Sequence, residues 1–228
     1  MISLLQQTWQ TLMAHRLKSI LAIIAIAWGV ISVIVLIALG EGFYRHQTQS
    51  LSFMVNNVQI AFPSSTSKPW HGMPSRRKIT IEQDKVDMLK QSGFVAQAST
   101  VYAKWDASVT NVRGQKLSGF VSGIDPSYFS LVQRKLESGS RNISPSDVIN
   151  HTRVAVLGDQ IAKMGNIKVG EQVKVNGIPF LVIGVIKDED AGISFGDSRK
   201  VFVPQTTYLD LWDAKPWMLL LKPIEGMD

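Results

Sequence analysis

Few side chains in this sequence have the types and spacing that metal or acid–base chemistry needs. Three adjacent carboxylates, Asp188, Glu189 and Asp190, could offer oxygen ligands to a calcium ion. They follow a strand-like segment and precede two glycines, which is typical of a solvated loop, so we favour a loop over a calcium site. The four histidines are scattered, with no two at a ligand spacing: His15, His46, His71 and His151. We therefore expect no metal site.

The sequence signatures of nucleotide and acyl chemistry are also missing. The chain has no Gly-x-x-x-x-Gly-Lys-Ser/Thr phosphate-binding loop and no Gly-x-Ser-x-Gly motif. It has no cysteine, which excludes disulfides and thiolate chemistry. Lys and Arg total 24 against 18 Asp and Glu, and the excess is dispersed apart from the run 76–78, which we interpret as a solvated loop. We expect neither an enzyme nor a cofactor, and no binding of nucleic acid.

The element that organises the chain is an uncharged stretch from Ser19 to Gly40. At about 1.5 Å of rise per residue, a helix of this length measures roughly 33 Å, which matches the hydrocarbon layer of a bilayer. A cleaved signal peptide is the competing interpretation, but the apolar run exceeds the roughly 7–15 residues of an ordinary signal core. We predict a retained membrane helix over 19–40, an amphipathic interfacial helix over 1–18 before it, and a stalk over 41–50 after it. The alternative for residues 1–18 is a frayed helical extension of the span.

Side chains in and beside this helix indicate its orientation and packing. Arg16 and Lys18 flank its N-terminal end, and residues 1–40 contain no Asp or Glu. The positive-inside rule therefore predicts a cytoplasmic N-terminus and a domain on the outer side of the membrane. Ala25, Gly29 and Ser32, spaced by four and three, form a small-residue strip suited to packing against another helix. The alternative is chance, because small residues are common in membrane helices.

Residues 51–228 predict one α+β domain of two subdomains with mostly antiparallel strands. The expected strands lie at 57–62, 95–112, 120–124, 154–157, 173–175, 180–183, 201–203 and 218–221, and the expected helices at 81–92, 127–132 and from Gly158 onward. Asn176-Gly177 between two apolar runs is the clearest local signal and predicts a two-residue hairpin turn. The Pro-containing segment 63–78 and the polar segment 137–151 are expected to be loops.

Capping residues and tryptophans complete the local predictions. Thr80 with Gln83 indicates a capping box, and Asp125 before Pro126 indicates an N-cap. Two tryptophans in strand-like segments, at positions 105 and 217, are predicted to be buried in the core. Trp70, in the Pro-containing loop, is the candidate for an exposed contact with a partner.

Short segments in a fixed order then give the chain a family likeness. They are 119–129 (GFVSGIDPSYF), 136–139, 154–158, 169–173, 180–185 and 201–204, preceded by 16–19, 31–34 and 40–42. The series resembles the periplasmic core domain of the MacB-like and FtsX-like ABC transporter permeases, and the N-terminal segments are similar to the first membrane helix of that family. The likeness rests on the order and spacing of the segments over nearly the whole chain.

The resemblance implies a permease subunit, or its N-terminal portion, of an ABC-type export, efflux or lipoprotein-release transporter in the bacterial inner membrane. Such a subunit couples ATP hydrolysis by a partner to movement of a periplasmic domain. The implied partners are a cytoplasmic ABC ATPase and a second permease subunit, with a periplasmic adaptor and an outer-membrane channel as further candidates.

The sequence departs from the family pattern after its strand-like segment at 218–221. Permeases of this kind have four membrane helices, whereas no second apolar span precedes Asp228. We therefore interpret the chain as a piece of a longer permease or a natural truncation before the second helix. The alternative function is that of a single-span periplasmic scaffold that binds an envelope partner without any ATPase.

Overall fold

The computed structural model describes residue 13 and residues 15–50, 58–188 and 194–224. Its backbone contacts divide the chain into two compact units, Met1–Thr48 and Gln49–Asp228. Most of the interfacial helix predicted over 1–18 lies outside the described residues, and so do Glu189 and Asp190 of the acidic cluster.

The first unit is dominated by one long helix, α2 (Arg16–Ser50). Within the described residues it holds a single candidate membrane span, Arg16–Tyr44, whose most apolar window has a mean hydropathy of 3.1 and buries none of its residues inside the protein. Many Ile and Val residues give this segment no strong intrinsic preference for helix, but in lipid only an internally hydrogen-bonded backbone is tolerated. The helix continues through residues 41–50, where a stalk was predicted.

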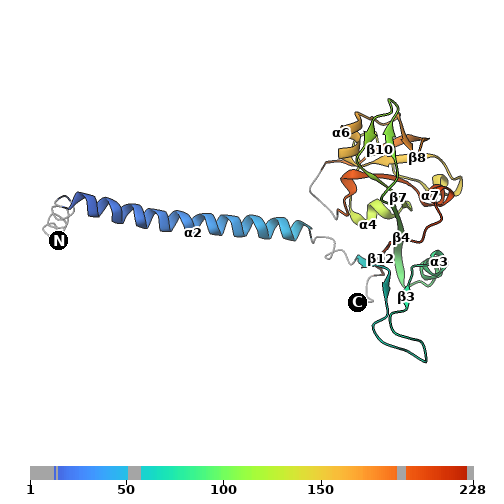
Figure 1. Ribbon diagram of the computed structural model, residues 1–228, viewed down its shortest axis with the longest axis horizontal. Helices are drawn as coiled ribbons and strands as arrows, with labels where there is room; N and C mark the ends of the chain where they lie inside the picture. The colour runs from blue at the N-terminus through green and yellow to red at the C-terminus, as the bar shows by residue number, and fades with distance from the viewer. Residues whose placement is uncertain (1–12, 14, 51–57, 189–193, 225–228) are drawn as a thin grey trace. The chain divides into compact units, whose positions relative to one another are not determined.

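The second unit is built on a mixed ten-stranded sheet (Figure 1). Across the sheet the strands are β1 (Gln59–Ala61), β12 (Met218–Pro223), β4 (Val95–Lys104), β7 (Phe120–Ile124), β11 (Lys200–Pro204), β8 (Val154–Leu157), β10 (Ile178–Val185), β9 (Gln172–Val175), β5 (Val109–Asn111) and β6 (Lys116–Leu117). Of its pairs between described residues, β7–β11 and β8–β10 are parallel and the others antiparallel. A separate hairpin pairs β2 (Ser64–Ser65) with β3 (Lys78–Ile79). The predicted α+β class with mostly antiparallel strands is confirmed.

One strand, β4, joins two parts of this unit. Its first part, from Val95 to Val101, pairs with β12, and its second part, from Tyr102 to Lys104, pairs with β7. Figure 1 shows β4 running from the region of β12 and α3 toward the region of β8 and β10. The two expected subdomains therefore share a strand and fall within one compact unit.

Short helices connect the strands: α3 (Gln83–Gln91), α4 (Tyr128–Val132), α5 (Pro145–Ile149), α6 (Asp159–Gly165), α7 (Gln205–Leu211) and a 3₁₀ turn, η2 (Asp197–Arg199). The capping box predicted from Thr80 is wrong, because the N-cap of α3 is Glu82, which makes no side-chain cap bond. At α4 the N-cap is Ser127 rather than Asp125, and the Ser127 backbone N–H donates to the Asp125 carboxylate over 3.0 Å.

Helices α5 and α7 were not predicted, and α5 lies inside the segment expected to be a polar loop. Residues within its first turn are sufficient to start the helix. The Ser144 hydroxyl accepts a hydrogen bond from the Asp147 backbone N–H, and the Asp147 carboxylate accepts one from the Ser144 backbone N–H. Pro145 occupies the first turn, where a missing N–H costs nothing. The capping signature was thus present in the sequence, but with Asp in place of the usual Glu or Gln.

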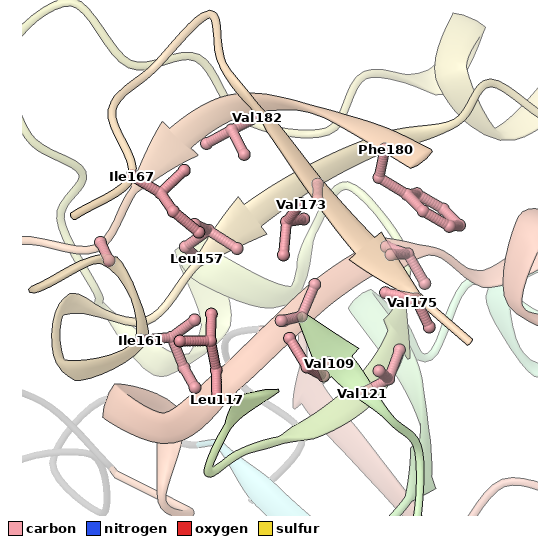
Figure 2. Close-up of a cluster of buried hydrophobic side chains, with 14 of the residues drawn as sticks. Val109, Leu117, Val121, Leu157, Ile161, Ile167, Val173, Val175, Phe180 and Val182 are labelled. Atoms are coloured by element: carbon pink, nitrogen blue, oxygen red, sulfur yellow. The ribbon is translucent and has the colours of Figure 1, made fainter. Parts of the chain in front are cut away.

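Two core clusters cover opposite faces of the central strands. Alternate residues divide between them, because successive side chains of a strand point to opposite faces: Ala155 and Leu157 join the first cluster, and Val154 and Val156 the second. Figure 2 shows the first cluster, which gathers Val109, Leu117, Val121, Leu157, Ile161, Ile167, Val173, Val175, Phe180 and Val182. Burial on both faces explains why residues 154–157 are continuously apolar.

The predicted hairpin between β9 and β10 is confirmed. Asn176 and Gly177 have φ angles of 48° and 83°, as a type I′ turn requires, and Ile178 pairs with Val175. The Asn176 side chain also accepts a bond of 2.9 Å from the Ser108 backbone, which ties the turn to the start of β5.

Candidate functional site

The first candidate site is the small-residue strip on α2. The structure places Ala25, Gly29 and Ser32 on one helix with all three exposed. A Cβ added at Gly29 would meet no atom within 4 Å, so nothing among the described residues occupies the space beside it. The Ser32 hydroxyl donates to the Trp28 carbonyl over 2.8 Å, which satisfies its donor inside the helix. The strip therefore offers close approach of a second helix without an unpaired polar group.

The two cations predicted to set the topology lie in the first turn of the same helix. Arg16 is its first residue, and its Nε donates to the Met13 carbonyl over 3.3 Å. Lys18 follows two residues later, and both precede the uncharged run. This arrangement places positive charge at one end of the apolar span, as the positive-inside rule needs.

The second candidate site is the segment 63–79, which is a β-hairpin rather than the predicted loop. After β2, the Thr66 backbone exchanges bonds with Arg76 and Arg77. At the far end Trp70 and Met73 exchange two backbone bonds of 3.1 and 2.9 Å. Between them His71 and Gly72 have φ angles of 46° and 78°, the signature of a type I′ turn. The His-Gly pair at the turn was the sequence signal for this hairpin.

Trp70 is exposed, as predicted. Its side chain is 68% accessible, and the Met73 side chain opposite is 40% accessible. The Trp70 ring packs edge-on against His71 at 4.7 Å, and the Arg77 guanidinium contacts the Met73 sulfur. The tip of this hairpin, which we call the 70–73 tip, thus carries a large apolar pair that the described part of the domain does not cover.

Aromatic rings form a third exposed feature at the ends of adjacent strands. Trp105 stacks on Phe120 at 4.3 Å and meets Trp217 at 5.8 Å, and Trp217 in turn meets Phe62 at 5.7 Å. The prediction that Trp105 is buried is wrong, since it is 59% accessible just after β4 ends. Trp217 is half-buried against the second core cluster. Strand-like flanks could not reveal that position 105 lies in the turn after the strand.

The most unusual electrostatic arrangement is internal. Lys200 and Asp197 form an ion pair of 2.8 Å with side-chain exposures of 0% and 1%. The Tyr128 hydroxyl donates to the same carboxylate oxygen over 3.1 Å, and three phenylalanine rings (Phe120, Phe195 and Phe202) surround the ammonium at 5.3 to 5.9 Å. Burial lowers the pKa of Lys200, and Asp197 opposes this effect. Burial, with the nearby Asp197 charge, raises the pKa of Tyr128 well above its usual value.

Nothing in this network has the form of a catalytic centre, because its groups are sealed from solvent. The described residues also hold no group of three or more His, Asp or Glu arranged for a metal. Asp188, the described member of the acidic cluster, forms an exposed ion pair of 2.5 Å with Lys163. Sequence reasoning missed the Lys200–Asp197 pair, since the two residues look like ordinary surface charges in a Gly-containing loop.

The sequence model of the MacB-like periplasmic core domain matches residues 19–227. The chain belongs to the MacB-like periplasmic core domain family. The match includes both the apolar helix and the sheet domain, so the family assignment covers the two units together.

Relatives of this MacB-like chain agree with the assignment. It is 28% identical over 197 residues to the uncharacterized ABC transporter permease YknZ of Bacillus subtilis, covering 85% of this chain and 49% of the relative. It is 30% identical over 202 residues to the macrolide export ATP-binding/permease protein MacB of a Shewanella strain, covering 85% of this chain and 29% of the relative. The chain thus spans from about a third to half of the length of these relatives.

Solved structures show the same fold. The periplasmic region of MacB from Actinobacillus actinomycetemcomitans superposes with a TM-score of 0.60 at 21% identity, covering 75% of this chain and 77% of that chain. The extracellular domain of YknZ gives a TM-score of 0.56 at 16% identity, covering 73% and 85%. These likenesses confirm the architecture of the MacB-like domain.

Proposed function

We propose that this MacB-like chain is the anchor and extracytoplasmic domain of an ABC-type export, efflux or lipoprotein-release permease in the bacterial inner membrane. Its role is to transmit motion, with ATP hydrolysed by a partner subunit in the cytoplasm. The observation that carries the proposal is the pairing, in one family match, of a membrane-length apolar helix with the periplasmic core domain.

The geometry supports transmission rather than chemistry. Helix α2 is continuous from Arg16 to Ser50, so its apolar span and the polar turns beyond it form one rigid element. The domain that follows is a compact unit held by two core clusters and a continuous sheet, which suits movement as a body. Residues 1–228 contain no phosphate-binding loop, so the proposal assigns ATP hydrolysis to a cytoplasmic ATPase outside these residues.

The partners that follow from this role are a cytoplasmic ABC ATPase and a second permease subunit. The small-residue strip Ala25–Gly29–Ser32 supports helix packing in such a dimer, and the proposed orientation has Arg16 and Lys18 in the cytoplasm. A periplasmic adaptor and an outer-membrane channel would be further partners of an exporter of this kind.

Distance measurements across the dimer test the coupling. Because the chain has no cysteine, a single Cys at exposed Gln160 gives one spin label per subunit. The chain is co-produced with its ATPase and the remaining membrane helices, and the distance between labels is measured without nucleotide and with ATP plus vanadate. We expect the distance distribution to shift. As a control, labels at Gln160 and Arg113 of one chain should keep a constant separation, because both lie in the same compact unit.

An unchanged distance between subunits in both nucleotide states would overturn the coupling. Purification of the chain from membranes then distinguishes the permease from the alternative function. Recovery of a nucleotide-binding subunit with the chain supports the permease, whereas recovery of envelope proteins alone supports a single-span scaffold without an ATPase.

A further inference from the structure

The 70–73 tip combines three properties that the proposed transport role does not use. It is closed by a well-formed type I′ turn, so its shape is fixed. Trp70 and Met73 exchange both backbone bonds and are therefore directly opposite, which puts their side chains on the same face of the hairpin. Both side chains remain exposed. An ordered turn that holds two large apolar side chains side by side in water is suited to contact with a partner surface.

Positively charged residues flank this apolar pair along the chain. Lys68, Arg76, Arg77 and Lys78 all lie within six residues of the turn and are exposed. None of them forms a salt bridge with a carboxylate of the described residues. The sequence contains no Asp or Glu anywhere from 42 to 81, so no acidic neighbour along the chain offsets them. The hairpin therefore presents four uncompensated cations beside its apolar tip.

We propose that this hairpin docks on the anionic phospholipid surface of the bilayer that holds α2. Trp70 and Met73 enter the boundary between headgroups and acyl chains, and the four cations lie among the lipid phosphates. Tryptophan favours this boundary because its ring is apolar and its indole N–H can still bond to water or headgroups. Lys and Arg place their charge at the headgroups while their stems cover apolar surface.

Chain length favours lipid over a soluble partner. Thirteen residues separate the end of α2 at Ser50 from the start of the hairpin at Ser64, so the two points lie no more than about 50 Å apart even if that segment is fully extended. The tether to α2 thus keeps the bilayer at a high effective concentration near the hairpin. Under these conditions even a contact of modest affinity between hairpin and lipid would be populated most of the time. Each Lys or Arg near an anionic surface strengthens binding about fivefold, and salt screens the effect.

A fluorescent label tests where the tip lies. The full chain, which has no native cysteine, receives a single Cys at exposed Ser75 and an NBD label, and is reconstituted in nanodiscs of POPC or of POPC/POPG at equal parts. We expect a blue-shifted, brighter NBD spectrum with POPG, reversed by about 0.5 M NaCl. A label at exposed Gln160 on α6 is the control and should give the same spectrum in both lipids.

Vesicle co-sedimentation of the compact unit 49–228, which carries its own core clusters, measures the contribution of the side chains. Arg76→Gln with Arg77→Gln should weaken binding to POPC/POPG vesicles about 25-fold, as two lost cations predict. The matched pair Arg113→Gln with Lys116→Gln removes the same charge from exposed positions on the β5–β6 hairpin and should change binding less than twofold. Trp70→Ala should weaken binding with the charge intact.

Three results would overturn the proposal. They are an NBD spectrum at position 75 that ignores lipid composition, equal loss of binding in the two charge-removal pairs, or a response at position 75 only to an added acidic protein. The last would assign the hairpin to a protein partner. Neither assay contains nucleotide or an ATPase, so its outcome is independent of the proposed coupling.

Discussion

Lys200 and Asp197 are charged groups held where water does not reach. Removing two charges from water is costly, and here the cost is offset by the 2.8 Å ion pair, the Tyr128 hydroxyl and the aromatic rings around the ammonium. The second carboxylate oxygen of Asp197 has no partner among the described residues. The pair therefore holds the loop before β11 in place, although one buried carboxylate oxygen of Asp197 stays without a hydrogen bond from the described residues.

Replacing one partner of this pair should be far more damaging than replacing both. Lys200→Met leaves the Asp197 charge buried and unpaired, and we expect a loss of about 3–5 kcal/mol in the free energy of unfolding. The double variant Lys200→Met with Asp197→Asn removes both charges and should recover a large part of that loss. Urea denaturation of the compact unit 49–228 measures both. Equal stability of the single and double variants would contradict this account of the pair.

Asp147 makes the stability of the domain sensitive to acid. Hydrogen bonding from Arg141, assisted by Ser144 and Thr152, holds the pKa of Asp147 well below its ordinary value. The carboxyl binds protons more weakly in the folded state, so its stabilisation is complete above about pH 5 and is lost progressively as the pH falls through the unfolded pKa of about 4 toward the lower folded pKa. Asp147→Asn should flatten this part of the stability–pH profile.

The control for this titration is Asp210→Asn. Asp210 pairs with His151 at the surface, where both side chains are half exposed. Exposed pairs contribute little, so this variant should keep the acid-dependent loss of stability of the native chain. Thermal or urea unfolding of each variant between about pH 3 and 7 gives the comparison, and parallel profiles for Asp147→Asn and the native chain would refute the assignment.

At the scale of elements, α2 carries a strip of small residues, but no second helix packs against it within the described chain. Gly29 is central to the proposed packing strip, and a bulky side chain there would hold a second helix away. We expect Gly29→Leu to weaken association of the chain in detergent or lipid by on the order of 1 kcal/mol, without reducing its insertion. Val35→Leu, also exposed on α2, is the matched control. Cysteine crosslinking or energy transfer between labelled chains measures the dimer.

At the scale of the whole molecule, the proposed orientation in the membrane rests on the positive charge at one end of the apolar span. An alkaline phosphatase fusion after Ile224 should be active, because that enzyme folds only outside the cytoplasm. Arg16→Glu with Lys18→Glu removes the positive flank and should lower the active fraction severalfold. Arg45→Gln, on the opposite flank, removes a competing cation and should leave the fusion active. A native fusion that is present in the membrane but inactive would refute the proposed topology.

The local sequence was sufficient to predict those elements that depend only on residues close to one another in the chain. The length of the uncharged run predicts α2, Asn176-Gly177 predicts the turn between β9 and β10, and the apolar run 154–157 predicts a strand buried on both faces. The α+β class and the family likeness also followed from the sequence, because they depend on the order of such segments. Helix α5 had its capping residues in the sequence and was missed only because Asp replaced the usual Glu.

The sequence by itself thus determined the membrane-length helix, the class of the domain and the exposed Trp70. Only the tertiary structure decided which segments meet. It paired β4 with both β12 and β7, left Trp105 in a turn open to solvent, and sealed Lys200 against Asp197. The physical reason is that burial and long-range pairing depend on neighbours far away in the chain, which no local pattern of side chains encodes.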